Sequence, residues 1–277
     1  MPSTPLFDGD IDSDHHLSIL HGLIRKIGNG VKPWEPYIRY QTFVTEYGSD
    51  AVQATILESF TKAMRQLIES PRIEFNTIKS IHESQSFNVE SHQGAGVYVH
   101  ILYDPDRNVM KIYVGSANSI AQRIKTHRKE LKSFRGSFGA RPKRRRKKSL
   151  HYEFWLPSRV QDFWLVACDI NPHQVQIGNP LNKATLASVL SITEMYVILL
   201  LRTLPQETLQ EYLPKRCNLR PCGWTGLNDA NPFRQYRSVT GSYSKGRSRF
   251  EGTWWRYADP AQGDRAATST KCPSCQQ

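Results

Sequence analysis

Cysteine is scarce in this chain, and no apolar stretch is long. Five cysteines in 277 residues are too few for a disulfide scaffold, so a reducing intracellular compartment is expected. The longest apolar run, Met195–Leu201, has seven residues, whereas a membrane-spanning helix needs about 20. The first sixteen residues are acidic and lack an apolar core, so no secretory signal peptide is expected there. We therefore expect no membrane partner.

Several common catalytic motifs are also missing. The sequence has no glycine-rich loop of the P-loop type and no pair of histidines at the helical spacing of metalloproteases. No Ser-His-Asp arrangement is evident either. These absences argue against nucleotide hydrolysis at a P-loop, zinc-dependent proteolysis and serine-based acyl transfer.

Positive charge is concentrated in one window. Residues 123–148 hold thirteen Lys/Arg and one acid, while the rest of the chain holds 24 residues of each sign. The whole net charge of +12 therefore comes from 26 consecutive residues. Such a concentrated positive field is typical of a nucleic-acid partner. The residues expected to contact phosphates are Arg123, Lys125, Arg128, Lys129, Lys143, Arg144, Arg145, Arg146, Lys147 and Lys148.

A β-hairpin is predicted just before this window, and a basic helix that follows the hairpin extends into it. Residues 96–103 and 109–114 are rich in β-branched and aromatic side chains, and a Pro/Asp/Asn turn separates them. A glycine, Gly115, ends the second strand, and Asn118 or Ser119 can cap a helix that continues to about Ser133. Arg123 and His127 are four residues apart, so they share one face of that helix.

The order of these residues resembles the GIY-YIG nuclease family. GVY at 96–98 matches its first motif, YVG at 113–115 matches its second, and Arg123 and His127 follow on the helix. The close resemblance covers about residues 94–133, with a looser continuation to about residue 235. It implies an α+β fold, in which a small three-stranded antiparallel sheet is flanked by helices. It also implies metal-dependent hydrolysis of phosphodiester bonds.

The same resemblance assigns roles to individual residues. Tyr98 is the family's candidate base, and Tyr113 or His127 would assist it. A phenol has a pKa near 10, so we expect Arg123 or a metal to lower that of Tyr98. Gly96 and Gly115 would support the two motifs.

Glu194 is the candidate metal ligand. It is the only acid in an otherwise apolar helix predicted over 183–203, and burying a lone carboxylate is costly. The acid could instead face solvent or pair with an arginine. In the family, a Glu on a helix after the third strand holds one divalent metal, so Glu194 would bind Mg²⁺ or Mn²⁺. A family Asn in a later loop corresponds to Asn228, with Asn231 and Asn218 as rivals.

Two further segments are predicted in regular structure. Asp50–Ser70 has apolar residues at helical spacing and is expected to form one amphipathic helix. Gln161–Ile170 is expected to be the third strand, and its two apolar faces are typical of a central position. The region from Cys217 to Phe233 is rich in Gly and Pro and is predicted as a loop.

Composition divides the chain into sections. We expect a disordered N-terminus, a helical region, a nuclease-like domain with a basic insertion, and a basic, aromatic tail, at residues 1–13, 14–90, 91–235 (insertion 134–150) and 236–277. The insertion could be a solvated linker, a DNA-contacting arm or a nuclear import signal. The tail could bind nucleic acid or fold back over the domain.

Four of the five cysteines could form a zinc site. Cys272 and Cys275 have the spacing of half a zinc knuckle, and they could join Cys217 and Cys222 in a four-thiolate site. They could also be half of a truncated zinc module, or hold no metal. The sequence as a whole predicts a nuclear, magnesium-dependent DNA endonuclease, with RNA as an alternative substrate. The alternative from another class is a nucleic-acid-binding or scaffolding protein with an inactive copy of the domain.

Overall fold

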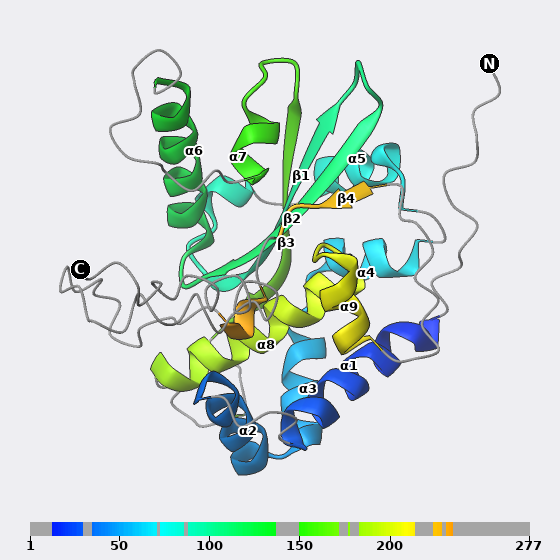
Figure 1. The fold of residues 1–277 in the computed structure, drawn as a ribbon, viewed down its shortest axis with the longest axis vertical. Helices are drawn as coiled ribbons and strands as arrows, with labels where there is room; N and C mark the ends of the chain where they lie inside the picture. The colour runs from blue at the N-terminus through cyan, green and yellow to red at the C-terminus, as the bar shows by residue number, and fades with distance from the viewer. Residues whose placement is uncertain are drawn as a thin grey trace, which may run out of the picture. The chain divides into compact units, whose positions relative to one another are not determined.

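A computed structural model describes residues 13–29, 35–70, 73–85, 88–136, 150–171, 177, 183–213, 224–228 and 231–234 (Figure 1). The elements in chain order are α1 (Ser13–Gly28), α2 (Glu35–Tyr47), α3 (Ser49–Glu58), α4 (Lys62–Glu69), α5 (Phe75–Glu83), η1 (Val89–Ser91), β1 (Ala95–Asp104), β2 (Val109–Ala117), α6 (Ile120–Gly136), α7 (Leu150–Trp155), β3 (Gln161–Ile170), α8 (Lys183–Leu200), α9 (Gln206–Tyr212), β4 (Trp224–Gly226) and η2 (Pro232–Arg234). The expected α+β class is confirmed for this part of the chain.

The sheet differs from the expected three antiparallel strands. Its order is β3-β1-β2-β4, and β4 pairs with β2 in parallel. The short β4 lies in a region predicted as loop because of its Gly and Pro content. Its Trp224 is buried and donates its indole N–H to the carbonyl of Leu201 at 2.8 Å, which fixes the segment beside β2. The sheet is therefore four-stranded and mixed.

The hairpin that carries the two tyrosine motifs forms as predicted. Asp104 pairs with Val109 at the turn, and Asn108 adopts a φ of 50°, a conformation that Asn tolerates. Successive residues of β1 point to opposite faces of the sheet. Tyr98 and His100 therefore share one face, while the valines next to them face the other way.

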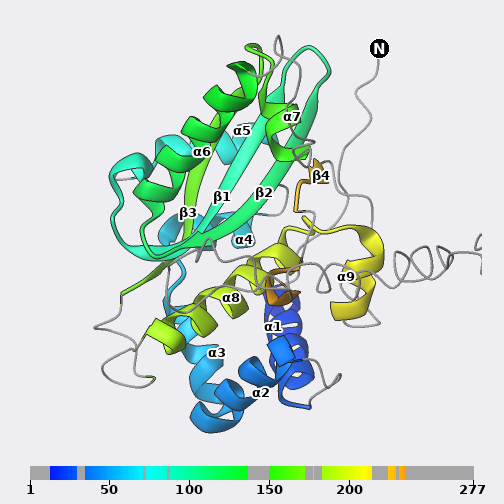
Figure 2. The ribbon, with the colours of Figure 1, turned by 60° about the vertical axis from the view of Figure 1, so that its left-hand side comes forward.

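Each face of the sheet has its own cover. Helices α6 and α7 lie on the face that carries Tyr98, where Ile120, Ile124 and Trp155 are buried with it. Helix α8 packs on the opposite face and lies between the sheet and helices α1–α3 (Figures 1 and 2). The buried valines Val97, Val99 and Val114 belong to this second core.

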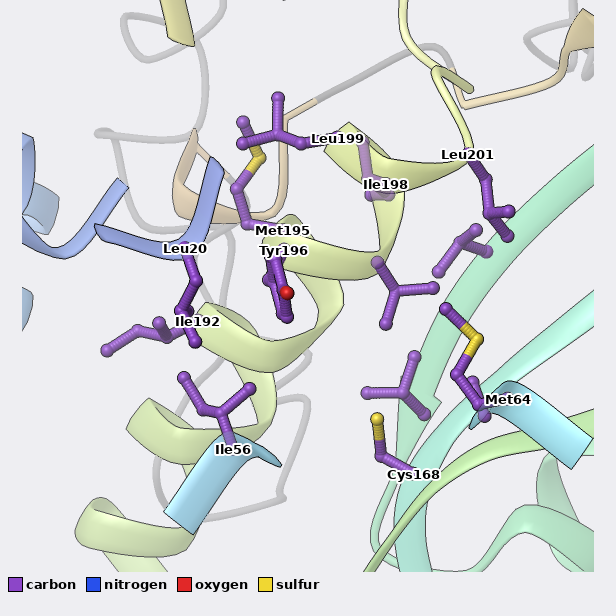
Figure 3. Close-up of a cluster of buried hydrophobic side chains, with 14 of the residues drawn as sticks. Leu20, Ile56, Met64, Cys168, Ile192, Met195, Tyr196, Ile198, Leu199 and Leu201 are labelled. Atoms are coloured by element: carbon purple, nitrogen blue, oxygen red, sulfur yellow. The ribbon is translucent and has the colours of Figure 1, made fainter. Parts of the chain in front are cut away.

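Helix α8 is apolar nearly all round because it is covered nearly all round. Figure 3 shows Leu20, Ile56, Met64 and Cys168 surrounding it, from α1, α3, α4 and β3. Helix α8 is therefore buried, as a helix that is apolar on all sides is expected to be. None of the helices in the described ranges is both long and apolar enough to cross a membrane.

The single helix predicted over 50–70 is wrong, because the chain breaks at Ser59–Thr61. Phe60 forms a β-bridge with Cys168, and the Thr61 side chain caps α4 by accepting the amide of Met64 at 3.2 Å. The amide of Thr61 donates to Ala167 of β3 at 3.0 Å. Contacts with the sheet thus override the helical periodicity.

The expected central place of β3 is also wrong, because β3 lies at one end of the strand order. Both of its faces are apolar since both are covered. Carbonyl groups on its outer edge accept hydrogen bonds from residues outside the sheet. The side-chain amide of Gln85 donates to Trp164 O at 3.2 Å, and the backbone amide of Thr61 donates to Ala167 O. A strand can thus look central in sequence while helices and side chains cover its edge.

Candidate active site

Tyr98 lies at the centre of the α6-covered face. It stands on β1 opposite Gly115 of β2, and its side chain is 0% exposed. A Cβ on residue 115 would fall within 2.6 Å of Tyr98 Cζ, so the phenol occupies the space that a side chain there would need. Gly96 allows a similar approach, since a Cβ there would lie 3.1 Å from the carbonyl carbon of Cys168 on β3. Because Gly115 and Gly96 have no side chain, the Tyr98 ring can approach β2 and the backbone of β3 can approach β1.

A chain of hydrogen bonds leads from Tyr98 to the surface. The Tyr98 hydroxyl lies 2.7 Å from His127 Nε2, and His127 Nδ1 lies 2.7 Å from the hydroxyl of Tyr152 on α7. Tyr152 in turn donates to the carboxylate of Glu130, an exposed residue of α6. A carboxylate only accepts, so Tyr152 must accept from His127 Nδ1–H. His127 Nε2 then carries no proton and accepts from Tyr98.

Burial sets the protonation of this pair. It raises the pKa of Tyr98 well above the usual value near 10, and Tyr113 adds to the rise. It lowers the pKa of His127 to about 2, with the positive Arg123 as the second cause. The expected lowering of the Tyr98 pKa is therefore wrong, because burial outweighs the nearby guanidinium. A protonated phenol faces a neutral imidazole.

Arg123 is the positive group of the site. It stands one helical turn before His127 on α6 and is half-buried. Burial alone would lower its pKa, but Tyr98 and Tyr113 raise it above its usual value. Its charge and a hydrogen bond act on the Tyr98 phenol in the direction that stabilises a phenolate. The helix therefore presents a permanent cation beside the phenol.

Tyr113 belongs to a second cluster of polar side chains, which was not predicted from the sequence. Its ring stacks on His151 of α7 with centroids 4.4 Å apart, and His151 Nε2 lies 2.7 Å from His100 Nδ1. His100 Nε2 lies 3.6 Å from Asp162, which also accepts from the Trp164 indole at 3.0 Å. Burial lowers the pKa of His100 to about 4. Strand alternation could have placed His100 beside Tyr98, but His151 is 51 residues away from it in sequence.

Glu194 reaches the site from the opposite layer. Its side chain on α8 is 2% exposed and accepts a hydrogen bond from Ser116 Oγ. Ser116 follows Gly115 on β2, and its side chain points to the α8 face by strand alternation. The charge of Glu194 still reaches the Tyr98 phenol, where it contributes to the raised pKa. The structure thus gathers Tyr98, Tyr113, Arg123 and His127 on one face, with Glu194 beneath the same end of β2.

The Glu194 region provides a donor set that suits a hard cation. A carboxylate with a hydroxyl beside it offers oxygen ligands only, and Mg²⁺ takes most of its remaining ligands from water and phosphate. Among the described residues, no three His, Cys, Asp or Glu side chains form a metal-binding group. A metal site at this place would therefore have the carboxylate of Glu194 as its one acidic ligand.

Asn228 holds the second motif in place. Its side-chain amide donates to Val114 O at 2.7 Å, and its carbonyl accepts from Val114 N at 2.9 Å. It therefore satisfies both backbone groups of the residue before Gly115. The rival Asn231 is buried elsewhere and accepts the amide of Phe233 at 2.8 Å, while Asn218 lies outside the described residues.

Apart from Arg123, the basic residues expected to bind phosphates divide into two groups. Lys125, Arg128 and Lys129 are exposed on α6, and Arg128 pairs with Glu90 of η1. Six more lie outside the described residues, at Lys143, Arg144, Arg145, Arg146, Lys147 and Lys148. The cysteines of the expected zinc site, Cys217, Cys222, Cys272 and Cys275, also lie outside them, as do residues 1–12 and 235–277.

Comparisons with known proteins do not assign this chain to a family. No protein-family model matched the chain, and searches of curated proteins and of solved structures found no match either.

Proposed function

We propose that this chain is a metal-dependent DNA endonuclease that hydrolyses phosphodiester bonds at a site of the GIY-YIG type. The observation that carries the proposal is the buried Tyr98–His127 hydrogen bond of 2.7 Å, with Arg123 beside the phenol. A phenol, an imidazole and a guanidinium on one face supply a proton acceptor system and a fixed positive charge. Phosphodiester hydrolysis needs both functions, a proton acceptor for the attacking water and positive charge at the phosphate.

In this proposal Arg123 binds the scissile phosphate and stabilises the charge that develops on its oxygens. Tyr98 takes a proton from the attacking water while it passes its own proton to His127 Nε2. This exchange avoids a free phenolate, which the raised pKa of Tyr98 disfavours. The atom that receives the proton is His127 Nε2, because it is the nitrogen of the ring that carries no proton.

Glu194, with Ser116 beside it, would hold the divalent cation, Mg²⁺ or Mn²⁺. When bound, that ion would polarise the phosphate and stabilise the leaving oxygen. Helix α8 buries Glu194 among apolar residues, and the Ser116 hydroxyl orients its carboxylate.

DNA is the proposed substrate because the basic residues of α6 adjoin the site. Lys125 and Lys129 are exposed on the helix that carries Arg123 and His127. Cations on that helix can bind the phosphates that flank a scissile bond, in DNA or in RNA. The Lys/Arg run at 143–148 supports a nuclear location for the same protein.

A second candidate is a nucleic-acid-binding protein whose copy of the site does not cleave. The near-complete burial of both Tyr98 and Glu194 favours it, since substrate must come within reach of each. Half-buried Arg123 and Tyr113 form the accessible margin of the site in either case. Both candidate functions include nucleic-acid binding, and they differ in whether the bound phosphodiester is hydrolysed.

The test is nucleic-acid cleavage with Mg²⁺ or Mn²⁺, using supercoiled, branched and single-stranded DNA and one RNA. We expect nicking of at least one DNA by the wild type, and a rate about 100-fold lower for Arg123→Ala. Arg65→Ala is the matched control, because Arg65 lies on α4 and donates to two nearby carbonyls, at 3.3 Å to Phe60 and 3.0 Å to Leu57. DNA binding without cleavage by the wild type would favour the second candidate.

A further inference from the structure

Tyr152 and Glu130 extend the Tyr98–His127 pair to the surface. Tyr98 and His127 are buried, Tyr152 is half-buried and Glu130 is exposed, so exposure rises along the chain of hydrogen bonds. The four residues come from three elements: Tyr98 from β1, His127 and Glu130 from α6, and Tyr152 from α7. Tyr152 packs against the cluster that contains Tyr98, Ile120 and Ile124, which is separate from the apolar core around α8.

We propose that Tyr98, His127, Tyr152 and Glu130 form a proton relay that carries the proton of the attacking water out of the site. The inference rests on the proposed function and adds Tyr152 and Glu130 as positioning residues that act through His127. The direction follows from the carboxylate, which can only accept at its end of the chain. Every donor in the chain therefore points outward.

The proton count balances along this path. The water oxygen forms a bond to phosphorus as the bond from phosphorus to the leaving oxygen breaks, and the water's proton moves to Tyr98. The Tyr98 proton moves to His127 Nε2, the His127 Nδ1 proton to Tyr152, and the Tyr152 proton to Glu130. Glu130 then loses its proton to solvent, and the leaving oxygen takes a proton from solvent. Each ring ends with one proton, as it began, and the proton of His127 has moved from Nδ1 to Nε2.

The arrangement explains why an imidazole can act here while it stays neutral. An imidazolium would be costly in this position, because burial and Arg123 both oppose it. In a concerted relay, His127 gains a proton at Nε2 as it loses one at Nδ1, so the ring gains no lasting charge. Without Tyr152 the second transfer has no acceptor, and the ring would have to carry the charge.

The test has one arm that does not depend on cleavage. Nitrogen NMR of ¹⁵N-histidine-labelled protein, assigned with His127→Gln, should show His127 protonated at Nδ1 and bare at Nε2. Protonation at Nε2 instead would reverse the chain and overturn the relay. The result holds whether or not the protein cleaves DNA.

The second arm measures single-turnover cleavage and DNA affinity. We expect Tyr152→Phe to lower the rate about 10- to 100-fold and Glu130→Gln to lower it about 10-fold, with unchanged DNA Kd. Glu130→Asp should recover part of the rate. Glu153→Gln, on α7 next to Tyr152, removes a charge outside the chain and should keep the wild-type rate.

The outcomes separate the relay from the activity. If the wild type cleaves and both Tyr152→Phe and Glu130→Gln match it, the relay is overturned and the nuclease remains. An equal loss in Glu153→Gln would also overturn it, because the effect would then come from local charge. If the wild type cleaves nothing, the proposed function fails and the relay fails with it.

Discussion

The two faces of the sheet have different compositions. The face toward α8 carries Val97, Val99 and Val114 and is packed with aliphatic side chains. The face toward α6 and α7 carries tyrosine, histidine and tryptophan rings joined by hydrogen bonds. Both faces come from the same strands, because alternate residues of β1 point in opposite directions. The comparison teaches that one face supplies stability while the other presents the candidate chemistry.

Glu194 is the exception on the aliphatic face, and it gives the sharpest way to test the comparison. We expect Glu194→Gln to reduce Mg²⁺-dependent cleavage more than 100-fold, because the ligand charge is lost. Stability should hold or rise, since an amide still accepts from Ser116 and avoids a buried charge. Cleavage rates, magnesium titration and thermal unfolding measure these effects, with Glu207→Gln of α9 as the control. A fully active Glu194→Gln would remove the metal role.

The histidines of the polar face should make the protein sensitive to acid. Burial lowers the pKa of His100 to about 4 and of His127 to about 2, and it lowers that of His151 as well. In the unfolded chain these rings take up protons near pH 6.5, so their stabilisation is complete above that pH and declines below it. Each ring contributes about 1.4 kcal/mol per pH unit, or roughly 4 kcal/mol per unit together at most.

Urea unfolding at pH 7.5, 6 and 5 measures this dependence. The free energy of unfolding should fall between pH 6.5 and about 4, and His127→Gln should make the fall shallower. Equal stability at pH 7.5 and 5 would show that the rings are protonated or solvated in the folded protein. The valines of the opposite face carry no titratable group and should contribute nothing to the pH dependence.

Asn228 should matter for stability more than an ordinary polar residue. Asn228→Ala leaves both backbone groups of Val114 without their partner, at a cost of about 2–4 kcal/mol. Asn118→Ala, at an exposed position after β2, should cost less than about 0.5 kcal/mol. Chemical denaturation measures both. A cost for Asn228→Ala no larger than that of the control would mean that β4 holds β2 without this side chain.

Gly115 should tolerate no side chain, because the Tyr98 ring occupies the space. Gly115→Ala should cost about 1–3 kcal/mol through overpacking and should lower cleavage as the phenol shifts. In Gly28→Ala the new Cβ would lie 3.8 Å from Val44, an ordinary contact, so this control should keep wild-type stability. Thermal unfolding and the cleavage assay measure the pair. Equal Tm values would mean that Tyr98 can move away without cost.

Local patterns predicted the elements that depend on neighbours in sequence. The strand at 161–170 has the expected bounds, and α8 differs from its predicted range only at its C-terminal end. The parts that failed depend on distant contacts. The break at Thr61 follows from its bond to Ala167, and β4 forms because Trp224 reaches Leu201. No periodicity in the sequence carries that information.

The candidate site shows the same limit. Tyr98, Arg123 and His127 lie within 30 residues and keep the spacing read from the sequence. Their partners are further away: Tyr152 is 25 residues from His127, and Ser116 is 78 residues from Glu194. The sequence also suggested a phenol with a lowered pKa. Burial produces the opposite shift, and burial is a property of the folded sheet.

The most direct measurement compares the two faces on one strand. Tyr98 lies on the polar face of β1, while Tyr103 lies on the other face and bonds to Asn108 at 3.0 Å. In single-turnover cleavage of a labelled DNA with Mg²⁺, we expect Tyr98→Phe to be about 100-fold slower or worse and Tyr103→Phe to match the wild type. Equal rates for the two variants would contradict the account, because the phenol on the polar face would then have no part in the reaction.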